Sequence, residues 1–370
     1  MIPQANPGAG YRALKSEIDD AVARALNSGW YILGAEGRAF ESEFAGWLGT
    51  PRAIGCANGT DALVLALRAL GIGPGTAVAT VSHTAVATVA AIEITGATPV
   101  LIDIDPAHYT MDPAELASVL ANPPPGLPPI KAVIPVHLYG QPADLAPIIT
   151  AAKTHGAAVV EDCAQAHGAT YHGAKVGTFT EAATFSLYPT KNLGALGDGG
   201  IVATADPDRA DLIAALRQYG WRNHYISTEP GINSRLDELQ AAILRVKLTH
   251  LDTHNTRRQT IAAAYDAALP AALRPPRRAN ATHVFHQYVL RLPDRAAIQA
   301  ALREAGIGSG IHYPQPVHLQ PAYRGRIAIG PAACAASAKA CTEVLSLPMY
   351  PELTDDEVTH ICTTLRTLFP

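Results

Sequence analysis

Several features that mark common protein classes are scarce in this sequence. Charged residues make up only 16% of the 370 positions and the formal net charge is −4, so a broad basic surface for nucleic acid is missing. The most apolar stretch, residues 76–104, is interrupted by His83, Glu93 and Pro99, and residues 1–10 lack a basic segment followed by an apolar one. We therefore expect a cytoplasmic protein with no membrane or nucleic-acid partner.

Cysteine is also scarce. The five cysteines are an odd number and show no Cys-x-x-Cys spacing, which argues against a disulfide framework and against a thiolate zinc site. The 14 histidines include no His-Glu-x-x-His pair. The sequence therefore predicts a protein of a reducing compartment that uses no metal.

Short apolar runs alternate with Ala- and Leu-rich stretches between residues 52 and 205. Runs that are apolar throughout are typical of strands covered on both faces, so the pattern predicts an α/β fold with a largely parallel, seven-stranded sheet flanked by helices. Such sheets bind ligands beyond the carboxyl ends of their strands. The predicted strands are Arg52–Cys56, Ala77–Val81, Thr98–Ile102, Ala132–Val136, Ala157–Glu161, Ala183–Leu187 and Gly200–Thr204.

The length of the chain favours two domains. A Ser-x-x-Asp pattern, Ser234 to Asp237, predicts a capping box before a long helix that runs towards Leu269. Beyond the Pro- and Arg-rich break at 270–278, a predicted strand and two helices indicate a small α+β domain. We place a large α/β domain with an N-terminal arm at residues 1–250, and the small C-terminal domain at residues 251–370.

Polar residues follow three of the predicted strands. Asn58, Gly59 and Thr60 open a helix after the first strand, where free N–H groups can hold a phosphate, although an ordinary helix cap explains the same residues. Asp162 follows another strand, where a carboxylate can pair with a cationic ring nitrogen, bind a metal or cap a helix. Each residue alone is therefore weak evidence for function.

Lys191 lies in a loop with Pro189 and four glycines, at the same predicted sheet edge as Asp162. A lysine that loses water contact there can shed its proton and attack a carbonyl carbon, although an isolated lysine is more often a surface residue. Neither Gly-x-x-x-x-Gly-Lys-Ser/Thr nor Gly-x-Gly-x-x-Gly occurs at the required position, which argues against a P-loop and a dinucleotide-binding dehydrogenase.

Together these segments resemble the fold-type I, pyridoxal phosphate (PLP)-dependent sugar aminotransferases of the DegT/DnrJ/StrS family. The resemblance covers nearly the whole chain, and its motifs occur in the family's order. They are Ser28–Gly34, Asn58–Leu63, Val136–Gly140, Glu161–Gln165, the Lys191 loop and Asn233–Glu238.

The resemblance implies a cofactor site shared between two subunits of a homodimer. Lys191 would bind the cofactor covalently and move a proton during transfer, while Asp162 would pair with the pyridinium nitrogen. Gln165 would bind the phenolic oxygen of the cofactor. The phosphate would be held by Gly59, Thr60 and Ser186 of one subunit and Asn233 of its neighbour.

The segment 191–200 resembles that of family members that aminate C3 of a sugar. The implied acceptor is a dTDP-linked 3-keto-6-deoxyhexose, with a UDP-linked 3-keto uronic acid or a 4-keto sugar as alternatives, and the implied donor is L-glutamate. PLP and pyridoxamine phosphate (PMP) would alternate as the cofactor. The substrate contacts we expect are Tyr31, Tyr188, Arg235, His312 and Tyr313, and Arg222 and His224 are further basic or polar candidates near the nucleotide.

One departure from the family concerns the face of the cofactor ring. An aromatic residue often stands two positions after His83, whereas this chain has Ala85, which cannot stack. Either His83, another side chain or the substrate would cover the ring. Two further alternatives are a dehydratase of the same fold and a non-catalytic, cofactor-binding regulator. Lys191 argues against the dehydratase, because such dehydratases have a histidine in place of the lysine.

Overall fold

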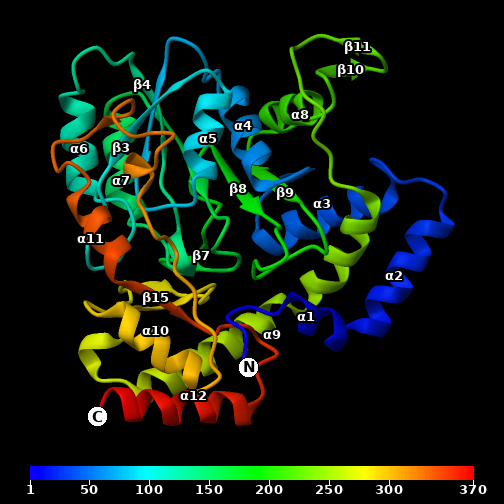
Figure 1. Cartoon of the computed structure of the whole chain (residues 1–370). Coiled ribbons are helices and arrows are strands. Elements are labelled where there is room, and N and C mark those ends of the chain that lie inside the picture. The colour runs from blue at the N-terminus through cyan, green and yellow to red at the C-terminus, as the bar shows by residue number, and fades with distance from the viewer.

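An eight-stranded sheet lies at the centre of the computed structural model, which describes residues 1–370 (Figure 1). Its strand order is β1-β9-β8-β5-β4-β2-β3-β14, and β9 alone runs antiparallel to its neighbours. The strands are β1 (Arg52–Cys56), β2 (Ala77–Val81), β3 (Thr98–Ile102), β4 (Ile130–Ile134), β5 (Ala158–Asp162), β8 (Ala182–Ser186), β9 (Gly200–Thr204) and β14 (Ala328–Ile329). The seven predicted strands are all present, and β14 adds an eighth.

Helices cover both faces of the sheet because adjacent apolar residues of each strand point to opposite sides. In β1, Ile54 packs with one cluster and Ala53 with the other. One face is covered by α4 (Gly59–Ala69), α5 (Ala87–Ile94) and α8 (Pro207–Leu216). The other is covered by α3 (Ala35–Leu48), α6 (Pro113–Ala121), α7 (Leu145–Thr154) and the first half of α9 (Glu238–Ala268).

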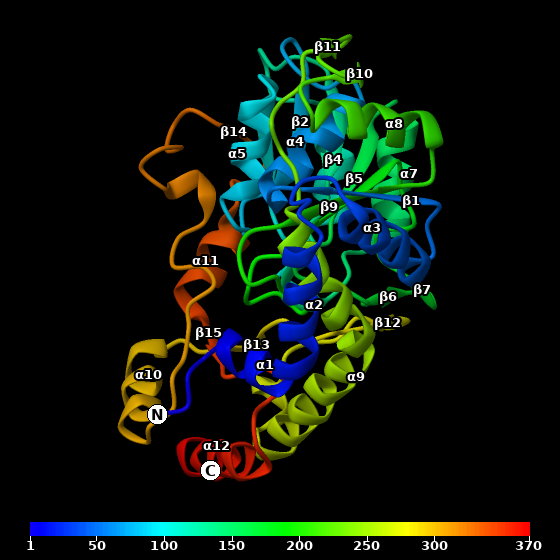
Figure 2. The same ribbon diagram turned by 90° about the vertical axis from the view of Figure 1, so that its right-hand side faces the viewer.

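Helix α9 joins the sheet to a smaller body (Figures 1 and 2). Its second half packs with β13 (Tyr288–Arg291), β15 (Val344–Leu347), α10 (Arg295–Glu304) and α12 (Asp355–Leu368). Ile2 joins that same cluster, and its backbone N–H donates to the carbonyl of Gly306, just after α10. The predicted boundary at residue 250 thus falls inside one continuous helix, and β14 returns from beyond it to pair with β3.

The remaining elements lie at the margins of these two bodies. No helix of the chain combines the length and the apolar character needed to cross a bilayer. The marginal elements are α1 (Pro7–Ala13), α2 (Lys15–Asn27), α11 (Ala335–Glu343), the β10–β11 hairpin (Trp221–Asn223 and Ile226–Ser227), and the small sheet of β6 (Thr170–Tyr171), β7 (Ala174–Lys175) and β12 (Ala281–Thr282).

The capping box predicted at Ser234 is wrong. Helix α9 begins only at Glu238, and its N-cap residue Asp237 makes no side-chain capping bond. The Ser234 hydroxyl instead donates to Asp61 Oδ2 (2.7 Å) and accepts from the backbone N–H of Ala57 (3.0 Å). Ser234 therefore ties the segment before α9 to the start of α4, a contact that local sequence spacing does not reveal.

Glu238 anchors the start of α3. Its buried carboxylate accepts hydrogen bonds from the backbone N–H groups of Gly34, Glu36 and Gly37, each at 2.8 Å. These N–H groups lie at a helix N-terminus, where an anion is favoured and where no intrahelical acceptor exists.

We predict that Glu238→Ala lowers the free energy of unfolding by about 3 kcal/mol or more, because it leaves three N–H groups without their acceptor. Urea unfolding of the two proteins measures the difference. Glu43→Ala is the control: it removes a partly exposed carboxylate that pairs with Arg245, which should cost about 1 kcal/mol or less. Equal losses in the two variants would contradict the anchoring role.

Candidate active site

A pocket of about 540 Å³ opens at the carboxyl ends of β5 and β8 and at the start of α4. This volume lies within the range of small-molecule sites. Six of the residues predicted for the site line it: Gly59, Thr60, Asp162, Ser186, Lys191 and Tyr188. Thr88 and Asp198, which the sequence did not single out, line it as well.

The start of α4 forms an anion cradle. Asn58 caps the helix by accepting from the N–H of Asp61 (2.8 Å), and the first backbone bond of the helix is donated by Ala62. The N–H groups of Gly59 and Thr60 precede that bond and have no helical acceptor. A Cβ on Gly59 would come within 2.7 Å of Ser186 Cβ, so only glycine lets the helix start approach Ser186. The pocket is thus lined by the residues that carry these two N–H groups and by two hydroxyl-bearing residues, Thr60 and Ser186. Donors of this kind are what a phosphate group requires.

Asp162 is a buried acceptor at the end of β5. Its carboxylate accepts from the N–H of Ala164 (3.1 Å) and from the Thr88 hydroxyl (3.0 Å). Burial raises its pKa, while these donors and the charge of Lys191 act in the opposite direction. A carboxylate held in this way can accept a further hydrogen bond from a cationic ring nitrogen in the pocket.

Lys191 faces the same pocket from the loop after β8. Burial lowers the pKa of its ammonium group to about 8, although the charge of Asp162 opposes the shift. The loop is tight: the N–H of Lys191 donates to the carbonyl of Tyr188 (2.8 Å), and a Cβ on Gly194 would come within 2.5 Å of the carbonyl oxygen of Pro189. A large fraction of the amine is therefore uncharged at mildly alkaline pH and can act as a nucleophile or a base.

Lys191 and Asp162 do not form an ion pair. Lys191 Nζ has no carboxylate oxygen within 4 Å, although Lys191 and Asp162 each shift the pKa of the other. Both line the pocket, so a flat ligand with a ring nitrogen at one end and a carbonyl at the other can lie between them. The phosphate cradle, the buried carboxylate and the amine with its lowered pKa together fit PLP.

A side-chain relay behind the pocket positions the Lys191 loop. Asn192 Nδ2 donates to Asn255 Oδ1 (2.8 Å) and to the carbonyl of Val284 (3.0 Å). Asn255 Nδ2 donates in turn to the carbonyl of His167 (2.8 Å), in the loop that follows Asp162. Sequence reasoning missed Asn255 because one asparagine within a long helix carries no local signal.

Gln165 lies beside the pocket and is held on two sides. Its Oε1 accepts from the N–H of Tyr139 (2.7 Å) and its Nε2 donates to the Tyr313 hydroxyl (3.0 Å). Burial raises the pKa of Tyr313 to about 12, so this hydroxyl stays protonated at neutral pH. One N–H of the Gln165 amide remains available to another acceptor.

His83 does not line the pocket. Its ring is fully buried and lies within hydrogen-bond distance of the Tyr139 hydroxyl (Nε2 to O, 2.7 Å) and of Cys341 Sγ (3.2 Å from Nδ1). Ala85 does line the pocket and leaves this wall small. His83 is therefore disfavoured as the residue that covers the face of the cofactor ring.

Besides Gln165, five of the expected contact residues do not line this pocket in the single chain. Asn233 and Arg235 line an adjoining cavity of about 420 Å³, which shares Asp198 with the first. Tyr31 is half exposed, and Tyr313 reaches the site only through Gln165. His312 Nδ1 lies 2.8 Å from the Ser346 hydroxyl, and burial lowers the pKa of His312 to about 4.

A buried cluster of His137, Glu161 and Cys163 has the residue types of a metal site but is already hydrogen-bonded. Nδ1 of His137 accepts from the N–H of Ala143 (2.9 Å), and Nε2 lies 3.1 Å from Glu161. Glu161 also accepts from the N–H groups of Gly177 and Phe179. Both ring nitrogens of His137 therefore already have partners, and the cluster joins neighbouring loops of the fold.

Residues 12–366 match the model of the DegT/DnrJ/EryC1/StrS aminotransferase family. The chain belongs to this family. Its relatives include the erythromycin biosynthesis sensory transduction protein EryC1 of Saccharopolyspora erythraea, 44% identical over 99% of both chains. A dTDP-3-amino-3,4,6-trideoxy-alpha-D-glucose transaminase of Streptomyces venezuelae is 43% identical (99% of this chain, 95% of that protein). A UDP-N-acetyl-3-dehydro-alpha-D-glucosamine 3-aminotransferase of Acidithiobacillus ferrooxidans is 42% identical (99% and 97%).

Solved structures of the family agree with the fold. DesV of S. venezuelae superposes with a TM-score of 0.94 at 42% identity, covering 99% of this chain and 98% of DesV. NtdA of Bacillus subtilis, 28% identical with a TM-score of 0.85, was solved with bound PMP and covers 95% of this chain and 81% of NtdA. The predicted fold class, enzyme class and cofactor are thereby confirmed: the protein is a PLP-dependent sugar aminotransferase.

The lowered pKa of Lys191 predicts a pH-dependent stability of the cofactor-free protein. Between about pH 8 and the ordinary lysine value of 10.5, the folded protein binds fewer protons than the unfolded chain, so its stability rises with pH. Lys191→Met removes the buried charge. At pH 7 the variant should therefore be more stable than the original by up to about 3 kcal/mol, and this difference should vanish above pH 10.5.

Denaturant unfolding across this pH range measures the difference. Lys153→Met, which removes an exposed lysine, is the control and should show no pH-dependent difference. A Lys191→Met effect that stays constant with pH would refute the lowered pKa.

Proposed function

We propose that this enzyme transfers the amino group of L-glutamate to carbon 3 of a dTDP-linked 3-keto-6-deoxyhexose, giving a dTDP-3-amino-3,6-dideoxyhexose. The observation that carries the proposal is the 43% identity, over 99% of the chain, to the S. venezuelae transaminase named for a dTDP-3-amino sugar. A UDP-linked 3-keto sugar is the second candidate acceptor, favoured by the relative from A. ferrooxidans.

The site residues would hold the cofactor by the contacts that their geometry allows. When bound, PLP supplies a carbonyl that takes up the amino group and a ring that withdraws electrons from the reacting carbon. The N–H groups and hydroxyls of Gly59, Thr60 and Ser186 would bind the phosphate. Asp162 would accept from the ring nitrogen, and the free N–H of Gln165 would donate to the phenolic oxygen.

Lys191 would act as the base and acid of the reaction. Its Nζ is close to neutral at mildly alkaline pH, so it can take a proton from the donor's carbon and return one to the acceptor's carbon. The tight loop and the Asn192–Asn255 contact hold the Nζ at one side of the pocket.

A second copy of the chain would complete the site. Lys191 is the only cationic residue that lines the pocket, whereas Asp61 and Asp198 add negative charge, a poor balance for an anionic phosphate. Trp30, Tyr31, Tyr225 and Ile226 are all at least half exposed, as residues of an interface in a single chain are. We propose a homodimer in which Asn233 reaches the partner's cofactor and Arg235, Tyr31, Tyr188, His312 and Tyr313 contact the nucleotide sugar.

The test combines the cofactor-loaded protein with glutamate and a panel of dTDP- and UDP-linked 3-keto and 4-keto sugars. Mass spectrometry should show replacement of the carbonyl oxygen by an amino group in the dTDP-3-keto sugar, with 2-oxoglutarate formed. If only the UDP-linked sugars are converted, the proposed dTDP nucleotide is wrong. If only the 4-keto sugars are converted, the proposed amination at carbon 3 is wrong. If no sugar is converted, the proposed function is wrong.

We predict that Asp162→Asn lowers kcat by roughly 10- to 100-fold, because the loss of one to two pKa units of ring-nitrogen stabilisation corresponds to about 1.4–2.8 kcal/mol. Steady-state kinetics with glutamate measures the change. The thermal unfolding midpoint of the cofactor-free variant shows whether the fold is intact. Full activity of a folded, cofactor-loaded variant would rule out this role for Asp162.

A further inference from the structure

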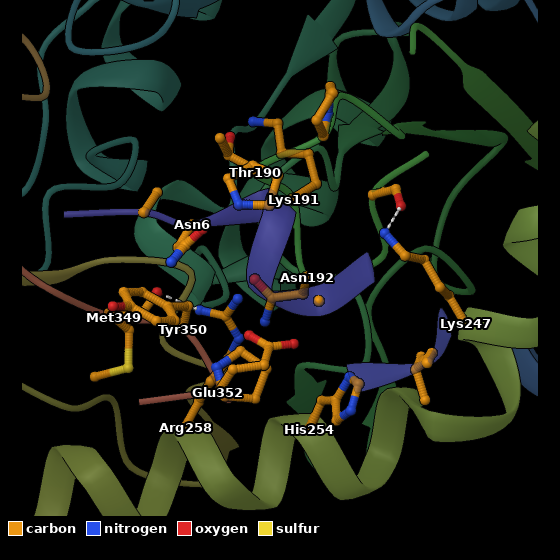
Figure 3. A pocket seen from close by; sticks show the side chains of 17 residues that line it. Asn6, Thr190, Lys191, Asn192, Lys247, His254, Arg258, Met349, Tyr350 and Glu352 are labelled. Atoms are coloured by element: carbon orange, nitrogen blue, oxygen red, sulfur yellow. Dashed lines mark hydrogen bonds between the residues drawn. The ribbon is translucent and has the colours of Figure 1, made fainter. Parts of the chain in front are cut away.

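Two sets of contacts hold the residues around the pocket. The first fixes the Lys191 loop from behind, where Lys247 of α9 donates to the carbonyl of Gly194 (2.6 Å; Figure 3). The second is centred on Tyr139, which lies in a short 3-10 helix, Leu138–Gly140, after β4. Tyr139 is buried, does not line the pocket and takes no part in the mechanism proposed above.

The backbone of Tyr139 determines the orientation of the Gln165 amide. Its N–H group lies 2.7 Å from Oε1 of Gln165. An N–H group can only donate, so the Gln165 atom that faces it must be the oxygen, and the amide nitrogen must point the other way. There the nitrogen donates to the Tyr313 hydroxyl (3.0 Å) and keeps one N–H for the phenolic oxygen of the cofactor.

Tyr139 has an unusual backbone conformation. Its φ of 62° and ψ of −1° lie in the left-handed region, which is sterically unfavourable for a residue with a Cβ. A residue keeps such a conformation only where its surroundings hold it. The carbonyl of Tyr139 accepts from the N–H of Gln287 (3.1 Å), and its hydroxyl has two further partners.

The Tyr139 hydroxyl joins a carbonyl to a buried histidine. It donates to the carbonyl of His312, which can only accept. Because the hydroxyl hydrogen is used there, Nε2 of His83 (2.7 Å) must carry the hydrogen of the second bond. Nδ1 of His83 is then unprotonated and faces Cys341 Sγ (3.2 Å). Burial lowers the pKa of His83 to about 4, so its ring is neutral, as this arrangement requires.

These bonds connect Gln165 with the segment 310–313, which pairs with β15 of the smaller body. Tyr139 holds the carbonyl of His312, and the next residue, Tyr313, bonds to Gln165. We propose that Tyr139 is a positioning residue, which directs the Gln165 amide towards the phenolic oxygen of the cofactor by holding both Gln165 and the segment that carries Tyr313. This role rests on the proposed function, which assigns Gln165 to the cofactor.

The absorption spectrum of the PLP-loaded protein, titrated with pH in the absence of substrate, tests this role. The visible band shifts when the proton beside the phenolic oxygen of the cofactor is lost. An N–H group that donates to this oxygen weakens its hold on the proton. Tyr139→Phe removes only the hydroxyl, and we expect it to raise the midpoint of the titration by about 0.5–1 pH unit.

Tyr265→Phe is the matched control. Tyr265 is also a buried tyrosine whose hydroxyl donates to a carbonyl, that of Pro348 (2.9 Å), but it belongs to α9 and does not line the pocket. The midpoint of the titration should stay unchanged in this variant. Equal shifts in Tyr139→Phe and Tyr265→Phe, or no shift in Tyr139→Phe, would overturn the proposal.

Tyr313→Phe reaches the same amide from the other side. It should raise the midpoint by a similar amount, because it removes the acceptor that holds the Gln165 nitrogen. The double variant Tyr139→Phe/Tyr313→Phe should raise the midpoint no further than either single change, since both act through one set of bonds. Shifts that simply add would contradict the connection through His312.

Gln165→Met separates this role from the proposed function. This variant should raise the midpoint at least as much as Tyr139→Phe. A shift in Gln165→Met without one in Tyr139→Phe would overturn the positioning role and leave the contact of Gln165 with the cofactor intact. No shift in Gln165→Met would reject that contact and the positioning role with it. The titration uses no sugar, so a wrong acceptor would leave its result unaffected.

Discussion

The buried carboxylate of Asp162 and the partly buried amine of Lys191 face one pocket without forming an ion pair, and the surrounding structure maintains this separation. A closed ion pair between Lys191 and Asp162 would satisfy both charges and leave no room for a cofactor. Thr88 and the N–H of Ala164 hold the carboxylate on one side, and the tight turn at Gly194 holds the amine on the other. The sheet contributes the two loops, because the neighbouring strands β5 and β8 run parallel and end at one edge.

Helix α9 connects the Lys191 loop to the rest of the molecule. Near its start, Glu238 organises α3; one turn or more further on, Lys247 and Asn255 contact the Lys191 loop, and Arg258 bonds to carbonyls of the smaller body. A single rigid rod therefore sets the position of the catalytic loop relative to both bodies. The chain crosses between the bodies several times, since Ile2 packs with the smaller one and β14 joins the large sheet.

The strands were predictable because each central strand is buried on both faces and its apolar run is continuous; β1, β2, β3 and β9 have the expected bounds. Strand β14 was not predictable, since two residues carry no pattern and their partner strand β3 lies far away in the sequence. Ser234 was mispredicted for a related reason. Its sequence pattern is typical of a helix cap, but its hydroxyl bonds to Asp61, which lies 173 positions away.

The sequence by itself determined the family, the order of the strands along the chain and the group of polar residues that follow them, including Gly59, Asp162 and Lys191. These features are local, because hydrophobic period and strand-end chemistry act over a few neighbouring residues. Only the tertiary structure decided that Thr88 bonds to Asp162 and that Asn255 supports the Lys191 loop. Such contacts join residues far apart in sequence, and packing alone brings them together.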